Sequence, residues 1–475
     1  MAQERTYDVI VLGAGAVGEN AADRAGTTGL SVAIVESELV GGECSYWACM
    51  PSKALLRPGA VLAAVRDVPG AAAAVTGTLD VDAVLARRTA FTHDWDDSSQ
   101  VDWVESVGID LVRGHARFTG PRTLEVTTDD GPVTLVARDA VIVATGSEPV
   151  MPPIPGLATA NAWTSREATA VEEVPASLVI IGGGVVGVEM ATAYTDLGCH
   201  VTLVVRGERV LSAAEPFAGD ALGESLRGLG VDVRLSTGVT SVARTDDGVV
   251  VVLEPGGEVH AAEVLVATGR RPRTADLGLE TIGLTPGKPL GVDAHLEVTE
   301  VAGSWLYAVG DVNGRTATTH QGKYGARVVG DVVAGRFGQN GDVRPGRFSR
   351  WNADADTVAV PQVVFTRPEV AWVGATEADA RAAGISVRCL DVELGSVAGA
   401  SVMGDSVGGR VRLVVDERRQ VVVGATFVGP EVAEMLHAAT IAVVGEVPLA
   451  RLWHAVPAYP TVSEVWLRLL ESAGL

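Results

Sequence analysis

"YDVIVLGAGAVGENAADRAGTTGLSVAIVE", residues 7–36, reads as an apolar strand, a glycine-rich turn, a helix and a second apolar strand. Gly13, Gly15 and Gly18 have the G-x-G-x-x-G spacing, in which glycines allow a tight turn, close approach of a pyrophosphate and close packing of helix on strand. The amino terminus of such a helix meets the phosphates with its positive dipole end. Glu36 closes the second strand, where a carboxylate accepts hydrogen bonds from a ribose. The stretch predicts a dinucleotide-binding module.

The same pattern recurs in "LVIIGGGVVGVEMATAYTDLGCHVTLVVR", residues 178–206. Gly182, Gly184 and Gly187 each lie 169 positions after their counterparts in the first stretch. The sequence therefore predicts a second nucleotide-binding module built like the first.

The second module lacks the ribose carboxylate. Carrying Glu36 forward by the same offset lands on Val205, which is followed by Arg206 and Arg209. A carboxylate repels a 2′-phosphate, whereas a guanidinium binds it through paired hydrogen bonds. This exchange predicts NADPH as the coenzyme, while NADH, with the two arginines as solvated surface residues, remains the alternative.

Two further strands end in the tripeptide Ala-Thr-Gly. "AVIVATGSEP" (140–149) contains Thr145 and Gly146, and "EVLVATGRRP" (263–272) contains Gly269. A second repeated feature of this kind is expected if the chain holds two related modules.

One more apolar strand precedes residue 346, and after that residue the character of the chain changes. "WLYAVGDV" (305–312) is another apolar strand, and it ends on Gly310 and Asp311. Beyond residue 346, alternating apolar and polar residues predict an antiparallel sheet, followed by helices over 431–444 and from 462 onward. This part is expected to form an α+β domain.

Composition limits the classes of function. The chain has 475 residues and a net charge of −22, which disfavours nucleic acid and anionic membranes as partners. No apolar run reaches membrane-spanning length, and the amino-terminal residues enter a strand without a signal-like segment. We therefore expect a soluble, cytoplasmic protein of several domains.

Two of the four cysteines lie close together in "GGECSYWACMPSK", residues 41–53. On a regular helix, the α-carbons of Cys44 and Cys49 would lie about 8.7 Å apart, beyond the about 7 Å that a disulfide tolerates. A disulfide would need a distorted first turn, which the double glycine at 41 and 42 would permit, and such a bond is readily reduced. Lys53 follows Cys49 by one turn. A zinc site is disfavoured because no second Cys/His cluster exists, and inert buried thiols are the other alternative.

Taken together, these motifs resemble the FAD-dependent pyridine nucleotide–disulfide oxidoreductases, the group that holds dihydrolipoamide dehydrogenase, glutathione reductase and mercuric reductase. The resemblance covers essentially the whole chain in the expected order. It implies an α/β fold with two Rossmann-like dinucleotide-binding domains, for FAD and NAD(P)H, plus a carboxyl-terminal α+β dimerisation domain. The implied boundaries are 1–155 and 280–350 for the FAD-binding and central parts, 156–279 for the NAD(P)H domain and 351–475 for the dimerisation domain.

The resemblance also assigns site residues. It implies that hydride from NADPH reaches the flavin, that Cys44 and Cys49 form the redox disulfide with Cys49 facing the flavin ring, and that Lys53 pairs with Glu189 beside the flavin. It implies no metal ligands. The implied FAD-binding residues are Gly13, Gly15, Gly18, Glu36, Gly42, Lys53, Thr145, Gly146, Gly310 and Asp311. The implied NADPH-binding residues are Gly182, Gly184, Gly187, Glu189, Arg206, Arg209 and Gly269.

The carboxyl-terminal segment "LWHAVPAYPTVSEVW" (452–466) departs from the family pattern. In dihydrolipoamide dehydrogenase a histidine precedes the Pro-Thr of this signature, but here Tyr459 takes its place, and a phenol is a poor base at neutral pH. Glu464 matches the glutamate of the signature. His454 is either a structural histidine or a substitute base. Mercuric reductases also have tyrosine here, but they carry a carboxyl-terminal cysteine pair, which "LLESAGL" does not contain.

These features favour an NADPH-dependent flavin disulfide reductase, a homodimer in which Tyr459 and Glu464 of one subunit reach the disulfide of the other. Its acceptor is predicted to be a small disulfide, a quinone or a soft metal ion. Two alternatives remain: a diaphorase that reduces quinones or metal ions from the flavin, and a redox sensor or binding flavoprotein.

Overall fold

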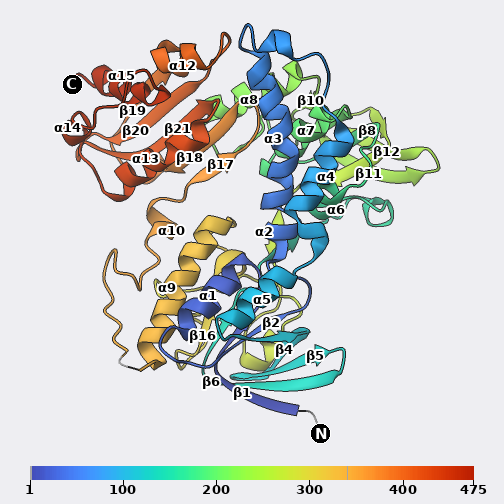
Figure 1. Ribbon diagram of the computed structural model, residues 1–475, viewed down its shortest axis with the longest axis vertical. Coiled ribbons are helices and arrows are strands. Elements are labelled where there is room, and N and C mark those ends of the chain that lie inside the picture. Colours follow the sequence, from blue (N-terminus) through green and yellow to red (C-terminus); the bar gives the residue numbers. More distant parts are fainter. Residues whose placement is uncertain (1–2, 340) are drawn as a thin grey trace. The chain divides into compact units, whose positions relative to one another are not determined.

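Strand β1 (Gln3–Leu12) and helix α1 (Ala16–Gly26) lie on either side of the first glycine turn in the computed structural model, which describes residues 3–339 and 341–475 (Figure 1). They belong to the first of two units, whose segments fall within 1–51, 89–148 and 270–357. The second unit takes its segments from 52–88, 149–269 and 358–475. The four-part division expected from the sequence is finer than these two units and stays a prediction.

The first unit is built on a seven-stranded sheet in the order β3-β2-β1-β6-β5-β4, with β16 paired to β6. Strands β2, β3 and β16 run parallel to their neighbours, while β4 and β5 form an antiparallel excursion. The parallel pairing β1·β2 and β1·β6 puts the carboxyl ends of the strands at one edge. Their bounds are β2 (Val32–Glu36), β3 (Asp110–Arg113), β4 (His115–Gly120), β5 (Thr123–Thr128), β6 (Gly131–Val143) and β16 (Leu306–Ala308).

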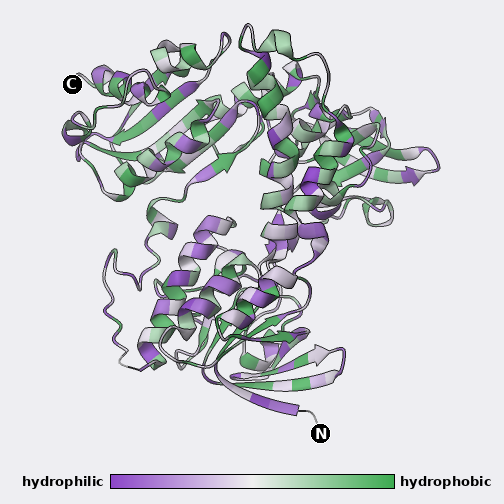
Figure 2. Cartoon of the chain, in the orientation of Figure 1, coloured by the Kyte–Doolittle hydropathy of each residue, from purple (hydrophilic) through white to green (hydrophobic). Residues whose placement is uncertain are grey.

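Helices α1, α5 (Ser98–Ser106) and α9 (Thr319–Phe337) are packed with this sheet (Figure 1). Helix α9 packs so closely on α1 that a Cβ at Gly322 would lie 2.5 Å from Val17. Figure 2 shows both helices alternating between hydrophilic and hydrophobic residues, as expected when one face is buried. Their alanines and valines form a core with the sheet.

The second unit contains a parallel four-stranded sheet in the order β10-β9-β8-β14. Helix α7 (Val185–Asp196) follows β8 through the second glycine turn, so the predicted repeat of strand, turn and helix is confirmed. A three-stranded antiparallel sheet, β11-β12-β13, belongs to the same unit. The bounds are β8 (Ser177–Ile181), β9 (His200–Val204), β10 (Asp232–Arg234), β11 (Gly238–Thr245), β12 (Gly248–Glu254), β13 (Glu258–Ala261) and β14 (Glu263–Val266).

The carboxyl-terminal part of this unit has the predicted antiparallel sheet and helices. The five strands run in the order β17-β18-β21-β20-β19, and helices α13 (Val432–Val444) and α15 (Val465–Ser472) share one core with them. The strand bounds are β17 (Gln362–Val364), β18 (Glu369–Gly374), β19 (Val387–Glu393), β20 (Arg410–Asp416) and β21 (Val421–Gly429).

The remaining helices belong to one or both of the two units. No helix within the described ranges is long and apolar enough to cross a membrane. Their bounds are α2 (Gly42–Tyr46), α3 (Cys49–Arg66), α4 (Val81–Phe91), α6 (Ser165–Ala170), α8 (Pro216–Gly228), α10 (Ala355–Val358), α11 (Glu377–Ala382), α12 (Ala398–Met403) and α14 (Leu449–Leu452).

Candidate active site

The first glycine turn has the backbone that a pyrophosphate cradle requires. Gly13 has φ +94°, and a Cβ there would lie 2.6 Å from the carbonyl oxygen of Ala144. Gly15 is the N-cap of α1 and offers no side chain to cap the helix, which leaves the first amides for a ligand. A Cβ at Gly18 would collide with the Gly13 carbonyl. Side chains at Gly13 and Gly18 would therefore clash with the backbone, while the first amides of α1 stay available to a phosphate.

We expect Gly13→Ala to destabilise the protein by about 3 kcal/mol, because alanine adds a steric collision to the cost of positive φ. Gly29 is a matched control, since it has φ +84° but nothing within 4 Å of the place that a Cβ would take. Gly29→Ala should cost only about 1 kcal/mol. Urea unfolding of the two variants with equal FAD content measures the difference, and equal losses would contradict the steric argument.

Glu36 is held in place by the backbone of its own module. Its two carboxylate oxygens accept hydrogen bonds from the amides of Ala14 and Glu38, each at 2.8 Å. Burial raises the pKa of Glu36, and these amides lower it. A backbone hydrogen bond from Ser37 adds to these, so the carboxylate is held in one orientation at the end of β2, where a ribose would lie.

The double glycine joins the cysteine segment to this turn. The amide of Gly41 donates to the carbonyl of Ala14 at 2.7 Å. Gly42 has φ +59°, and a Cβ there would lie 2.8 Å from the α-carbon of Gly15. Gly42 thus lets the start of α2 lie directly on the glycine turn, and this cradle fits FAD.

The two cysteines lie on either side of a break between helices. Helix α2 ends at Tyr46, Trp47 has the non-helical angles φ −136° and ψ 1°, and helix α3 begins at Cys49. The expected distortion is present: Gly41 and Gly42 have φ +109° and +59° at the start of α2, and the helix is also broken at Trp47, between the two cysteines.

Both cysteines carry free thiols and are half-buried. A hydrogen bond to Cys49, together with burial, raises the pKa of Cys44, while a hydrogen bond to Thr319 and the charge of Lys323 lower it. Cys49 Sγ lies 3.2 Å from the hydroxyl of Thr319. The two thiols are therefore in contact with each other and with the first turn of α9, which is the arrangement of a reduced dithiol.

Lys53 and Glu189 form the predicted ion pair, with Nζ and Oε2 2.7 Å apart. The Glu189 side chain is 4 % exposed, and its other oxygen accepts from the amide of Phe365 at 3.0 Å. Lys53 Nζ also lies 5.1 Å from the centre of the Phe365 ring, a favourable cation–π distance. Phe365 thus contacts both members of the pair.

Asp311 and Glu43 are linked by a chain of polar contacts within the first unit. Ser147 donates to Asp311 at 2.5 Å and accepts from Arg270 Nε at 2.8 Å. Arg270 lies 3.5 Å from the Glu43 carboxylate, and Arg273 lies 3.8 Å from it. The acid beside Cys44 is therefore balanced by two arginines.

The Ala-Thr-Gly tripeptides face the glycine turns in both modules. Ala144 faces Gly13 in the first, and in the second a Cβ at Gly182 would collide with the carbonyl of Ala267. Thr145 donates to the carbonyl of Arg273 at 2.8 Å. The carbonyls of Gly146 and Gly269 also join strand ends, because they accept from the amides of Arg273 and Val150 respectively.

The second glycine turn repeats the geometry of the first. Gly184 is the N-cap of α7 without a side-chain cap, and a Cβ at Gly187 would collide with the Gly182 carbonyl, as Gly18 does with Gly13. Val205, at the position of the lost carboxylate, is buried.

The two arginines after Val205 differ in their contacts. Arg206 is exposed and makes no hydrogen bond or ion pair with any residue that the structure describes. Arg209 is 37 % exposed and pairs with Asp220 at 3.3 Å. Arg206 is thus the more available cation.

The carboxyl-terminal candidates have different surroundings. Tyr459 is 76 % exposed and His454 is exposed. Glu464 is buried, and Arg468 donates to it at 2.8 Å. Helix α15 thus fixes Glu464, while Tyr459 is open to another molecule.

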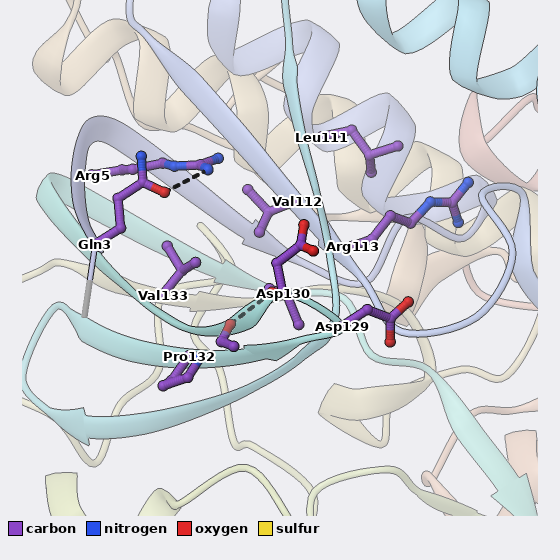
Figure 3. A pocket seen from close by; sticks show the side chains of 11 residues that line it. Gln3, Arg5, Leu111, Val112, Arg113, Asp129, Asp130, Pro132 and Val133 are labelled. Atoms are coloured by element: carbon purple, nitrogen blue, oxygen red, sulfur yellow. Dashed lines mark hydrogen bonds between the residues drawn. The ribbon is translucent and has the colours of Figure 1, made fainter. Parts of the chain in front are cut away.

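A hollow of about 690 Å³ in the first unit has Arg5, Arg113, Asp129 and Asp130 in its lining (Figure 3). None of the site residues predicted from the sequence lines it. Over the described ranges, no three His, Cys, Asp or Glu side chains are grouped to hold a metal ion.

Three contacting residues were not predicted from the sequence: Thr319, Ser147 and Phe365. Thr319 follows Cys49 by 270 positions, Ser147 precedes Asp311 by 164, and Phe365 follows Glu189 by 176. No local motif marks them, because each contact arises only when distant elements pack together.

Comparison with known proteins identifies the family of the chain. Residues 7–326 match the family described as pyridine nucleotide-disulphide oxidoreductase, and residues 360–469 match its dimerisation domain. The chain is 31 % identical to a mercuric reductase of Staphylococcus aureus over 96 % of this chain and 81 % of that one. It is 32 % identical to a dihydrolipoyl dehydrogenase of Thermus scotoductus over 98 % and 97 %.

Solved structures agree with the fold. The HOCl-induced flavoprotein disulfide reductase RclA from Escherichia coli matches with a TM-score of 0.83 at 25 % identity, over 98 % of this chain and 99 % of that one. LpdA from Mycobacterium tuberculosis matches with a TM-score of 0.83 at 25 % identity, over 99 % and 100 %. Enzymes of this kind use FAD and NAD(P)H, and the predicted α/β fold is confirmed. The chain belongs to the pyridine nucleotide-disulphide oxidoreductases and is an FAD-containing enzyme of that family.

Proposed function

We propose that this enzyme passes electrons from NADPH, by way of FAD, to the Cys44–Cys49 pair and from there to a small disulfide. The observation that carries the proposal is the thiol pair itself, in mutual contact and hydrogen-bonded to Thr319. The pair follows a glycine pair that touches the FAD cradle. Bound FAD supplies the step that converts a hydride into electrons for a disulfide.

The cysteines take different parts in this proposal. The hydrogen bond between them and burial raise the pKa of Cys44, so Cys44 keeps its proton while Cys49 accepts the bond. Thr319 contacts Cys49 from α9 and holds its sulfur in place. Cys44 is then the thiol that exchanges with the acceptor after losing its proton.

Arg206 supports NADPH as the coenzyme, because its guanidinium has no partner among the described residues and follows the buried Val205. We expect Arg206→Leu to raise the KM for NADPH at least about tenfold, since a charge-assisted hydrogen bond is lost, and to leave the KM for NADH unchanged. Arg209→Leu should have a smaller effect, because Arg209 already pairs with Asp220. Steady-state kinetics with both coenzymes measures this, and parallel changes for NADPH and NADH would contradict it.

A homodimer is part of the proposal. The match of residues 360–469 to a dimerisation domain supports it. Val456 and Tyr459 are 84 % and 76 % exposed, so this segment offers an apolar and aromatic surface to a second copy. Tyr459 and Glu464 would then serve the disulfide of the other subunit, and His454 remains the alternative base.

The test is a panel of acceptors with NADPH as donor: small disulfides, quinones, Hg²⁺ and Cu²⁺. The proposal predicts the highest kcat/KM with a disulfide, and loss of that activity when the reduced enzyme is alkylated before assay. A relative is named a mercuric reductase, so Hg²⁺ is the informative competitor. Disulfide turnover that survives alkylation would overturn the proposal.

The second candidate is a diaphorase that reduces quinones or metal ions without the thiols. The tyrosine in place of the histidine base favours it, because Tyr459 is a poor proton carrier at neutral pH. Quinone reduction would then persist in Cys44→Ser/Cys49→Ser protein, and a dead double variant would exclude this candidate.

A further inference from the structure

Helix α9 carries a lysine that forms no ion pair with any residue in the described ranges. Lys323 is half-buried, but its ammonium makes no hydrogen bond and no ion pair within 4 Å among residues 3–339 and 341–475. It lies one helical turn after Thr319, so both side chains share one face of α9. Because Thr319 contacts Cys49, that face is the one turned to the thiol pair.

A carboxylate on α1 is the second group on which the charge of this lysine acts. Glu19 has one carboxylate oxygen that is buried and has no hydrogen-bond partner in the described chain. Burial raises the pKa of Glu19 to about 7, and the charge of Lys323 lowers it. The close packing of Gly322 on Val17 brings this part of α9 against α1.

We propose that Lys323, shared between Glu19 and Cys44, is the positioning cation that stabilises the Cys44 thiolate in the chain's own subunit. The inference deepens the proposed function, because it rests on Cys44 being the exchanging thiol. A cation is needed there, since Cys44 would lose its proton beside an already anionic Cys49, and a nearby ammonium offsets that repulsion. The family's histidine is replaced by Tyr459, which supplies no such charge.

Other charged groups lie near this cluster in the described part of the chain. Glu43, next to Cys44 in the chain, is balanced by Arg270 and Arg273. The charge of Glu36 raises the pKa of Glu19, and the charge of Glu19 raises the pKa of Tyr46. The groups facing Cys44 are Cys49 from α3 and Thr319 and Lys323 from α9, and those facing Glu19 are Lys323 from α9, Glu36 from β2 and Tyr46 from α2.

These charges fix the direction in which each substitution should shift the pKa of Cys44. Below about pH 7 the Glu19 carboxyl is protonated, so the whole charge of Lys323 acts on Cys44. Above that pH the carboxylate shares the ammonium, which weakens its effect on the thiolate. Removing Lys323 therefore raises the pKa of Cys44, and removing the charge of Glu19 lowers it.

The test is the pH dependence of alkylation of Cys44 by iodoacetamide, in FAD-loaded full-length Cys49→Ser protein without NADPH or acceptor. Peptide mass spectrometry separates Cys44 from Cys199 and Cys389. We expect Lys323→Met to raise the pH midpoint of Cys44 alkylation by about one pH unit. Glu19→Gln should lower that midpoint by about half a pH unit, as the loss of a single nearby charge does. Lys323→Arg keeps the positive charge, so its alkylation midpoint should equal that of the parent.

Arg327 is the matched control, since it is an exposed cation one turn further along α9. Arg327→Met should leave the midpoint in place. The inference is overturned if Lys323→Met shifts the midpoint no more than Arg327→Met, or if Lys323→Met and Glu19→Gln shift it in the same direction. Because no turnover is measured, failure here is distinct from failure of the proposed acceptor chemistry.

Discussion

Cys44→Ser protein is expected to lose NADPH-dependent disulfide reduction by at least about a thousandfold, since a hydroxyl cannot replace a thiolate nucleophile. FAD should stay bound, because the residues of the cradle, Gly13, Gly15 and Gly42, are untouched. The chain contacts of Cys44 are with Cys49 and Thr319, and serine preserves the size of the side chain. The measurement is kcat with a small disulfide, normalised to flavin absorbance.

Cys389→Ser is the control for removing a thiol elsewhere. Cys389 lies on β19, where it is half-buried and hydrogen-bonded to Glu377. Serine keeps a donor for that hydrogen bond. This variant should turn over like the parent. Undiminished disulfide reduction by Cys44→Ser would mean that the acceptor takes electrons without exchanging with this sulfur.

Because the family resemblance places Lys53 beside the flavin, we expect Lys53→Met to slow the reduction of bound FAD by NADPH about a hundredfold, the usual effect of removing one preorganised charge from a reacting centre. The substitution leaves the Glu189 carboxylate buried with only the Phe365 amide as a partner. A buried carboxylate without its cation takes up a proton more readily. Stopped-flow measurement of flavin absorbance after mixing with NADPH gives the rate.

Arg57→Met removes an equal charge from the same helix, one turn further along, at an exposed position. NADPH should reduce the bound FAD of this variant at the parent rate. Glu189→Gln should resemble Lys53→Met, because it breaks the same pair from the other side. Parent-like reduction rates in Lys53→Met protein would assign the pair a structural role only.

Local geometry explains why the glycine modules could be predicted. Gly13 and Gly182 have φ +94° and +120°, and a Cβ at Gly18 or Gly187 would collide with the carbonyl of the glycine five positions earlier. Such constraints are imposed within a short stretch of chain, so they leave a readable spacing of glycines. The ion pair of Lys53 with Glu189 was predicted correctly through the family resemblance.

The surroundings of the thiols could not be read in the same way. The helix break falls at Trp47, four residues before Pro51, which has no amide hydrogen to donate to the Trp47 carbonyl and whose ring would clash with it in a continuous helix. Thr319, 270 positions after Cys49, reaches that thiol because α9 packs against α1. Glu43 reads as an isolated acid in the sequence, and only the fold shows its two arginines.

Anaerobic titration with NADPH tests the central claim that electrons pass through the flavin to the thiol pair. The oxidised enzyme should take up its first equivalent of NADPH with little loss of the main flavin absorbance. A long-wavelength band should then appear, from a Cys49 thiolate beside oxidised flavin, and Cys49→Ser protein should lack it. Direct bleaching of the flavin by the first equivalent, in parent and variant alike, would contradict the account.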